Sequence, residues 1–283
     1  PLAKMDIVKS LLVYYSNRYL SGDLDDFISE QFGQAFRSFS RIKRMAGEPG
    51  YKIGQIDRSA FGEDDVLRYH YLAFNGGPYG VTVGDYWATS EAVLDVFLKP
   101  ALKELRVNKE RLNAFIVDYT SDLTRFFVAF EELIRETRSD KRAYLLWVIQ
   151  DLSATLYPLL IRLHLHGWLK QSCADDPRTL MEIIEMTDLR VFKLRGTNPQ
   201  AGIFRTTRDL HQHTADWVAK ELKNFCDWGM PDAMMASRLT DEDMYRNPAL
   251  QRMLLQEEGH ARAKVGEQDL TLDELVALNR AGL

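Results

Sequence analysis

The feature that most constrains the fold is an unbroken amphipathic stretch between residues 108 and 138. Apolar residues recur there at alternating three- and four-residue steps, which places them on one face of an α-helix. They are Leu112, Phe115, Ile116, Tyr119, Leu123, Phe126, Phe127, Phe130, Leu133 and Ile134. Asn108 suits the N-cap position, and at 1.5 Å per residue the helix is roughly 45 Å long. We expect it to be the central helix of the fold.

Helical periodicity also fills most of the remaining chain. We expect helices at 7–19, 27–42, 64–74, 90–105 with Pro100 bending or splitting it, and a buried hairpin at 140–169. Residues 75–80 read as a turn. Start and stop residues predict later helices from Asp176-Pro177 to Gly196, from Thr206 or Thr207 to Gly229, from Asn247-Pro248, and from Thr271 to Gly282. The sequence therefore predicts an all-α multi-helix bundle of about ten helices around one long central helix.

Composition is that of an ordinary globular chain, with 46% hydrophobic and 27% charged residues. Proline and glycine do not gather into a linker, so we expect 1–283 to form a single helical body, or two lobes at 1–138 and 139–283. The chain starts with Pro1 rather than with an initiator Met. We therefore expect it to be a fragment of a longer protein.

Charge and cysteine content limit the location and the partners of the chain. Cys173 and Cys226 match no zinc spacing and no disulfide framework, which favours reduced thiols in the cytoplasm. The most apolar run, 144–169, is broken by charged residues and is too polar for a membrane span, so we expect no membrane contact. A net charge of −5 restricts any contact with nucleic acid to a local surface.

No complete catalytic motif occurs in the sequence. It lacks an H-E-x-x-H pair, a G-x-S-x-G elbow and a Walker loop, so we assign no catalytic residue, no metal ligand and no cofactor to this chain. Glu257 and His260 form one E-x-x-H pair, whereas a di-iron bundle needs two. The H-x-H pairs, His164 with His166 and His211 with His213, point to different sides of a helix, so we expect locally partnered histidines at the edge of the core.

Two basic clusters are candidates for contact with the DNA backbone. The first consists of Arg37, Arg41 and Arg44, and the second surrounds the turn at 196–199 and consists of Arg190, Lys193, Arg195, Arg205 and Arg208. A helix end, a turn and the next helix start can present several cations to phosphates. If the chain contacts nucleic acid, we expect the second cluster to be the main site. A solvated charged face is the alternative for both clusters.

Several segments resemble a known family. Residues 1–9, Pro-Leu-Ala-Lys-Met-Asp-Ile-Val-Lys, have the form L-x-x-x-D-x-x-K at the start of an apolar helix. This resembles the stretch that follows an N-x-x-G turn in GmrSD-type restriction endonucleases, which are modification-dependent enzymes. The order of later segments is also similar: the short helix at 64–74, the basic region at 191–209, and a helix with Tyr245, Arg246, Asn247, Arg252, Leu254, Leu255 and Glu257.

The resemblance implies a role within a larger enzyme. In such proteins an N-terminal ParB-like domain with a D-G-Q-Q-R motif handles nucleotide, and a C-terminal His-Asn-His domain with an H-x-x-P motif cuts DNA. Neither motif occurs here. The resemblance thus implies an inactive helical bridging module of a phage-defence endonuclease, with flanking domains and duplex DNA as partners. Nucleotide and divalent metal are expected only in the full-length protein.

Two other interpretations stay open. The chain could be a self-contained protein-interaction module, in which the aromatic stripes include a groove for a partner. A metal-carboxylate enzyme is the weakest interpretation, because only one E-x-x-H pair is present. The sequence leaves open whether the chain forms a homo-oligomer.

Overall fold

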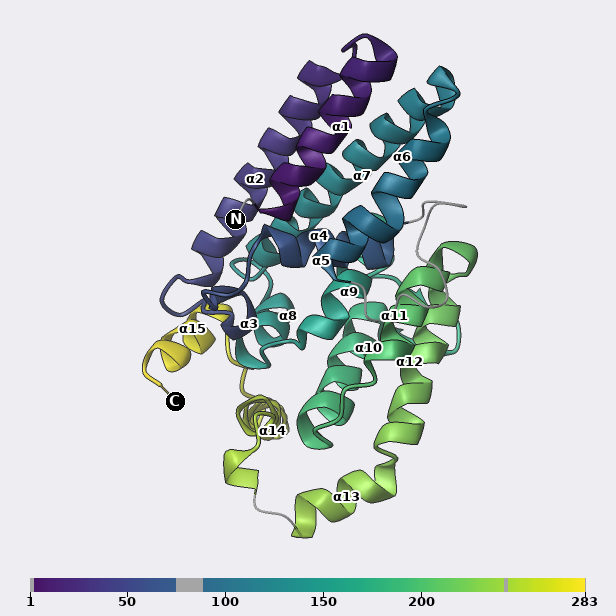
Figure 1. Ribbon diagram of the computed structural model, residues 1–283. Coiled ribbons are helices and arrows are strands. Elements are labelled where there is room, and N and C mark those ends of the chain that lie inside the picture. Colours follow the sequence, from purple (N-terminus) through teal and green to yellow (C-terminus); the bar gives the residue numbers. More distant parts are fainter. Residues whose placement is uncertain (1–2, 75–88, 242–243, 283) are drawn as a thin grey trace.

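The computed structural model describes residues 3–74, 89–241 and 244–282 (Figure 1). Within these ranges the fold is all-α, as predicted, and the only strands are β1 (Ser172–Cys173) and β2 (Asp176–Thr179), which form one antiparallel pair. The turn expected at 75–80 lies outside the described residues. None of the described helices combines the length and the apolar character that crossing a membrane requires.

The predicted central helix is confirmed as α7 (Lys109–Glu136), which is 28 residues long. The Asn108 side chain caps it by accepting a hydrogen bond from the Arg111 N–H at 3.0 Å. α7 lies beside α2 (Asp25–Ala46), and the two helices run in the same direction (Figure 1). Thr124, in the middle of α7, donates to the Gln31 carbonyl, and Arg138, just past its end, donates to the Met45 carbonyl, as a parallel register requires.

Two further helical segments lie beside α2 and α7 and form one layer with them. α1 (Lys4–Leu20) folds back on α2 through a tight turn, in which Ser21 and Gly22 have φ values of 63° and 83°. On the other side of α7, α5 (Ser90–Ala92) continues into a π-helical segment (Val93–Leu98) and then α6 (Lys99–Leu105). Pro100 lies in the first turn of α6, so the missing N–H falls where the π-helical segment gives way to regular α-helix.

Shorter helices pack below this layer and supply the rest of the core (Figure 1). α4 (Glu63–Ala73) and α9 (Tyr157–Leu165) both lie against α7. The other helices of this part are α3 (Gly54–Asp57), α8 (Lys141–Tyr144), α10 (Leu180–Thr187), α11 (Gln200–Asp209) and α12 (Ala215–Gly229). One cluster of buried hydrophobic residues includes side chains from α1 through to α15.

Two predicted helix starts were wrong. Asp176 and Pro177 belong to β2, and the helix begins at Leu180 behind a capping box of Thr179 and Glu182. The Asp176 carboxylate binds Arg178 and Lys223, so it is not available as a cap. The second wrong start is at Thr206 or Thr207, which lie inside α11 and donate their hydroxyls to the carbonyls four residues earlier. The helix that ends at Gly229 begins instead behind Thr214, which caps it.

The C-terminal helices form an open strap that returns to the body (Figure 1). The strap contains α13 (Asp232–Asp241), α14 (Leu250–Lys264) and α15 (Leu272–Arg280), and an ion pair between Arg252 and Glu185 fastens α14. α15 docks beside Gly50, whose carbonyl accepts hydrogen bonds from Asn279 and Tyr144. The helical segments outnumber the expected ten, because short segments such as α3 and α8 have no periodicity long enough to read.

The aromatic core of α7 should dominate stability. Phe130 is fully buried against Phe61, Trp147 and Tyr157, so Phe130→Ala should lower the free energy of unfolding by roughly 3–5 kcal/mol. Val107→Ala, at a position that is 86% exposed, should change it by less than about 0.5 kcal/mol. Urea denaturation measures both. A loss below about 1 kcal/mol for Phe130→Ala would mean that this face of α7 is not packed in the core.

Candidate functional site

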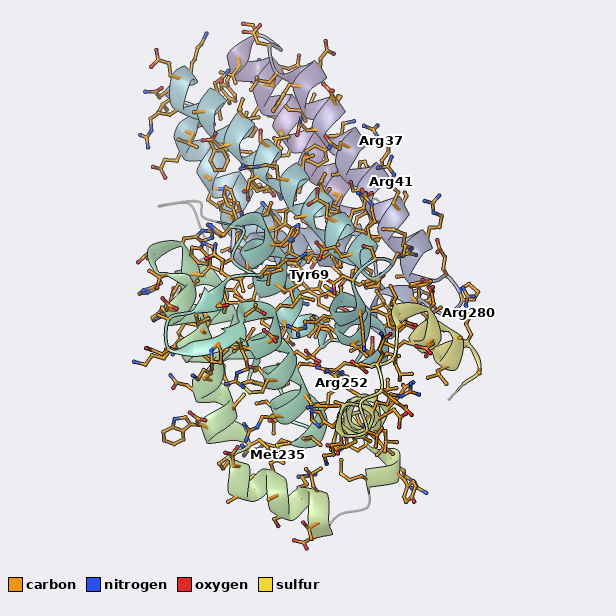
Figure 2. The ribbon with its side chains drawn as sticks, turned by 180° about the vertical axis from the view of Figure 1, so that it is seen from behind. Arg37, Arg41, Tyr69, Met235, Arg252 and Arg280 are labelled. Atoms are coloured by element: carbon orange, nitrogen blue, oxygen red, sulfur yellow. The ribbon has the colours of Figure 1, made fainter. Side chains whose placement is uncertain are left out.

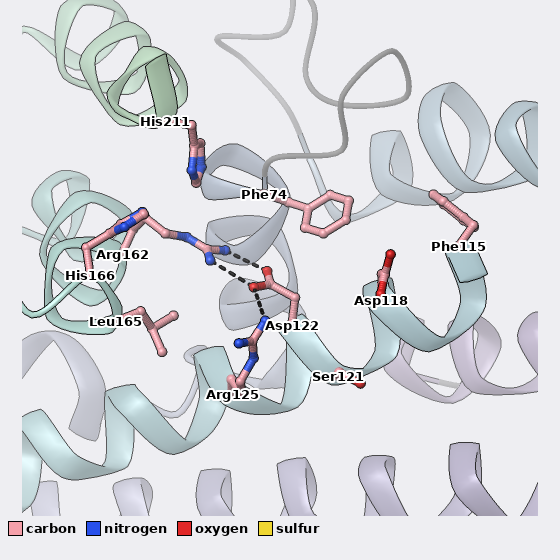
Figure 3. Close-up of a pocket in the computed structure, with 10 residues that line it drawn as sticks. All are labelled: Phe74, Phe115, Asp118, Ser121, Asp122, Arg125, Arg162, Leu165, His166 and His211. Carbon is pink, nitrogen blue, oxygen red and sulfur yellow. Dashed lines mark hydrogen bonds and ion pairs between the residues drawn. The ribbon is translucent and has the colours of Figure 1, made fainter. Parts of the chain in front are cut away.

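A buried ionic cluster joins three helices at the carboxylate of Asp122 on α7 (Figure 3). Arg162 of α9 donates to both carboxylate oxygens, at 2.9 and 2.7 Å. His70 of α4 places its Nε2 atom 2.9 Å from Oδ2, and Arg125, one turn along α7, donates to Oδ1 at 3.3 Å. One carboxylate therefore holds α4, α7 and α9 together and fixes the direction of two guanidinium groups.

The electrostatics of this cluster leave it with an excess of positive charge. Burial alone would raise the pKa of the Asp122 carboxyl, but hydrogen bonds from Arg162 and His70 hold it well below its usual range. Complete burial lowers the pKa of His70 in spite of its bond to Asp122, so His70 is a neutral donor there. Two guanidinium charges from Arg125 and Arg162 thus face one carboxylate charge.

A pocket of about 540 Å³ opens above the cluster (Figure 3). Its wall combines two phenyl rings, two arginines, two histidines, two carboxylates, one hydroxyl and one aliphatic side chain. These are Phe74, Phe115, Arg125, Arg162, His166, His211, Asp118, Asp122, Ser121 and Leu165. The side chains come from α7 and α9 and from the residues that follow α4, α9 and α11, so separate parts of the sequence meet at this one place.

The two histidines of the pocket are neutral at physiological pH. The Nε2–H of His211 donates to the Ala73 carbonyl at 2.8 Å, because a carbonyl can only accept. Burial lowers the pKa of His211 to about 4, and partial burial together with the nearby Arg162 charge lowers that of His166. The Nδ1 atom of His211 is therefore a hydrogen-bond acceptor.

The other histidines singled out in the sequence have local partners, as expected. His164 lies 3.0 Å from a Glu132 oxygen, and His213 stacks on Trp217 at 4.0 Å between ring centroids. Glu257 and His260 are exposed and 3.7 Å apart. Among the residues that the structure describes, no three His, Cys, Asp or Glu side chains are grouped so that they could hold a metal ion.

The second basic cluster is largely engaged within the fold. Arg190 pairs with Asp232, Lys193 donates to the Asp151 carbonyl at 2.6 Å, and Arg208 pairs with its neighbour Asp209. Arg195 donates to the carbonyls of Trp228 and Gly229 at the end of α12. Arg205 is exposed on α11. Most of these cations therefore close helix ends or bind carboxylates.

The first basic cluster lies on the outer face of α2 and is called here the α2 arginine row, which consists of Arg37, Arg41 and Arg44 (Figure 2). All three are exposed. Arg41 shares the buried carboxylate of Glu131 with Arg135 of α7, and Arg138 binds Glu48 at 2.8 Å. Together with Arg135 and Arg138, the surface around the row contains five guanidinium groups and two carboxylates, so it carries excess positive charge.

Comparisons of the chain with known protein families, curated proteins and solved structures found no match. The roles of the pocket above Asp122 and of the α2 arginine row are therefore inferred from their geometry.

The depressed pKa of His211 should be visible as a pH-dependent stability. In the unfolded state His211 becomes protonated below a pH of about 6.5, whereas in the folded state it stays neutral down to about pH 4. The free energy of unfolding should therefore fall as the pH is lowered across this window. His211→Asn keeps a donor for the Ala73 carbonyl but does not titrate, so its stability should fall less steeply.

Urea denaturation of both proteins at about pH 7 and pH 5 measures the difference. His260→Asn, at an exposed histidine on α14, is the control and should behave like the natural chain. Parallel pH dependence in the natural chain and His211→Asn would contradict the assignment of a neutral His211 to the folded state.

Proposed function

We propose that this chain is the helical bridging module of a nucleotide-dependent DNA restriction endonuclease. In this proposal it couples a nucleotide-sensing N-terminal domain to a C-terminal nuclease domain and contacts the DNA backbone. The order of the segments that resemble the GmrSD-type enzymes supports the coupling role. The α2 arginine row is the observation that carries the DNA contact.

The spacing of the α2 arginine row suits a sugar-phosphate backbone. Arg37 and Arg44 are seven residues apart, which corresponds to roughly 10 Å along a helix axis. One DNA strand carries a phosphate about every 3.4 Å of duplex axis, so the row spans about three phosphates. Because phosphate contacts do not read base edges, binding should be independent of sequence.

The α2 row is a stronger candidate than the turn at 190–208, which the sequence favoured. Arg190 and Arg208 already face carboxylates, and Lys193 and Arg195 already donate to carbonyls. Moving those donors to phosphates would break contacts within the fold. On α2, Arg37 and Arg44 are exposed, and if Arg41 left Glu131 that carboxylate would keep its ion pair with Arg135.

A protein-interaction module is the second candidate, and exposed apolar side chains near the C-terminal strap favour it. Trp228 and Tyr245 are 87% and 89% exposed, and Met234 and Leu254 are 44% and 60% exposed. Exposed aromatic residues are enriched at protein interfaces. An interaction module without a role at DNA would show no salt-dependent DNA binding, so the titration below separates the two candidates.

Replacing the α2 arginine row should weaken DNA binding and its dependence on salt. We expect the natural chain to bind duplex DNA with a Kd on the order of 10⁻⁴ to 10⁻⁶ M. In the Arg37→Gln, Arg41→Gln, Arg44→Gln triple variant, the slope of log affinity against log salt should fall by up to about three units. Fluorescence anisotropy at several salt concentrations measures both quantities.

The matched variant Arg195→Ala, Arg205→Ala, Arg208→Ala removes the same charge from the turn and should change the slope less. If only this second variant loses binding, the DNA contact belongs to the turn. If the natural chain shows no binding even at low salt, both clusters are solvated faces and the DNA contact fails.

The bridging role also predicts that this chain alone neither hydrolyses nucleotides nor cuts DNA, because the sequence supplies no nucleophile assembly for such chemistry. Incubation with Mg²⁺ or Mn²⁺, nucleotides, and plain or modified DNA is the test. Turnover that a point substitution within the chain abolishes would show that the chain is itself an enzyme.

A further inference from the structure

We propose that the pocket above Asp122 binds one nucleotide unit, with its phosphate at Arg125 and Arg162 and its base beside Phe74, Phe115 and Asp118. This site lies apart from the α2 arginine row and does not depend on the proposed backbone contact. Its ligand would be an anion that also carries a flat ring with N–H groups. Each end of the pocket offers groups that match one part of such a ligand (Figure 3).

The arginine end offers donors that are already oriented. A guanidinium group has five N–H donors in a fixed plane. Arg162 uses its two terminal nitrogens for Asp122, and its Nε is buried without a hydrogen-bond partner among the described residues. Arg125 is anchored on the same carboxylate, yet 68% of its side chain is exposed. Arg125 therefore offers the accessible donors for the oxygens of a phosphate, and Arg162, whose side chain is 6% exposed, adds positive charge behind it.

The charge at this end favours an anion. The pocket holds two guanidinium groups and two carboxylates, and its His211 is neutral, so it is neutral overall and its positive charge is concentrated at the arginine end, away from Asp118. His166, the other pocket histidine, is neutral as well.

The opposite end offers rings and acceptors instead of cations. Phe74 and Phe115 are half-buried and line the pocket, and each also contacts Tyr119, which holds its ring in place. Phenyl faces of this kind accept the flat face of a nucleobase. Asp118 lies one turn from Asp122 on α7 and is exposed at the pocket, where its carboxylate can accept hydrogen bonds from base N–H groups.

The combination distinguishes a nucleotide from simpler ligands. An inorganic anion would occupy only the arginine end, and a neutral aromatic compound would leave the guanidinium groups at that end with no anionic partner besides Asp122. A volume of about 540 Å³ lies within the range of small-molecule pockets. The same chemistry can come from a free mononucleotide or from one nucleotide of a single strand, whereas a base that stays paired in a duplex cannot enter.

Titration calorimetry of the chain with the four deoxynucleoside monophosphates, the matching nucleosides, inorganic phosphate and a short single-stranded oligonucleotide tests the proposal. At least one monophosphate or the oligonucleotide should bind, and at least tenfold more tightly than its nucleoside or inorganic phosphate. Binding of monophosphates identifies free nucleotide as a source, and binding of the oligonucleotide alone identifies a single strand.

Variants at exposed residues keep the fold and locate the ligand. Arg125→Gln should weaken binding at least tenfold, and Asp118→Asn should change the preference among the four bases. Arg18→Gln, at an exposed arginine near the end of α1, is the matched control and should bind normally. Thermal denaturation of each variant confirms that it is folded.

Three results would overturn the proposal: no heat with any nucleotide or oligonucleotide at about 10 mM, unchanged binding by Arg125→Gln, or equal affinity for inorganic phosphate and every monophosphate. The α2 triple variant separates this site from the proposed backbone contact. It should lose duplex binding and keep nucleotide binding, whereas Arg125→Gln should do the reverse.

Discussion

The carboxylate of Asp122 is the point on which the arrangement of helices around the pocket depends. It is buried on α7, so it would be costly without partners, and three groups from α4, α7 and α9 satisfy it. Removal of Arg162 would leave the buried Asp122 carboxylate with hydrogen bonds from His70 and, at 3.3 Å, from Arg125 alone. The same interaction turns two guanidinium groups toward one cavity. Support of the fold and preparation of a binding surface are therefore two results of one buried ion pair.

The sequence predicted the long elements of the fold well, because periodicity over many residues averages out local exceptions. The stripe from Leu112 to Ile134 identified α7, and the capping box at Thr271 identified the start of α15. The errors fell where a cap residue had a tertiary partner. Asp176 looked like an N-cap, but Arg178 and Lys223 bind its carboxylate, and these contacts cannot be read from the local pattern. Caps predicted from the local sequence were correct only where the cap side chain had no tertiary partner.

The pocket escaped sequence analysis for a related reason. His70, Asp122 and Arg162 are far apart in the chain, and each alone looks like an ordinary polar residue in an apolar stretch. The sequence did contain a signal for this site. Asp122 falls between Tyr119, Leu123 and Phe126 on the buried face of the longest helix, where a carboxylate needs a partner. Arg162 gives the same indication within the apolar stretch of α9. A search for charged residues on buried faces would have found both, although it could not have paired them.

The pocket above Asp122 and the α2 arginine row both depend on α7. This helix therefore determines how binding at one surface could affect the other. Asp122 and Glu131 are nine residues apart, so the pocket and the acid behind the α2 arginine row are separated by roughly 13 Å along one helix. That distance exceeds the screening length of about 8 Å at physiological salt, so the charge of a bound phosphate is weakly felt at the row. Mechanical coupling would require α7 to move as a rigid body relative to α2, which the hydrogen bonds of Thr124 and Arg138 to α2 carbonyls oppose. The two surfaces should thus behave as nearly independent sites on one rigid frame.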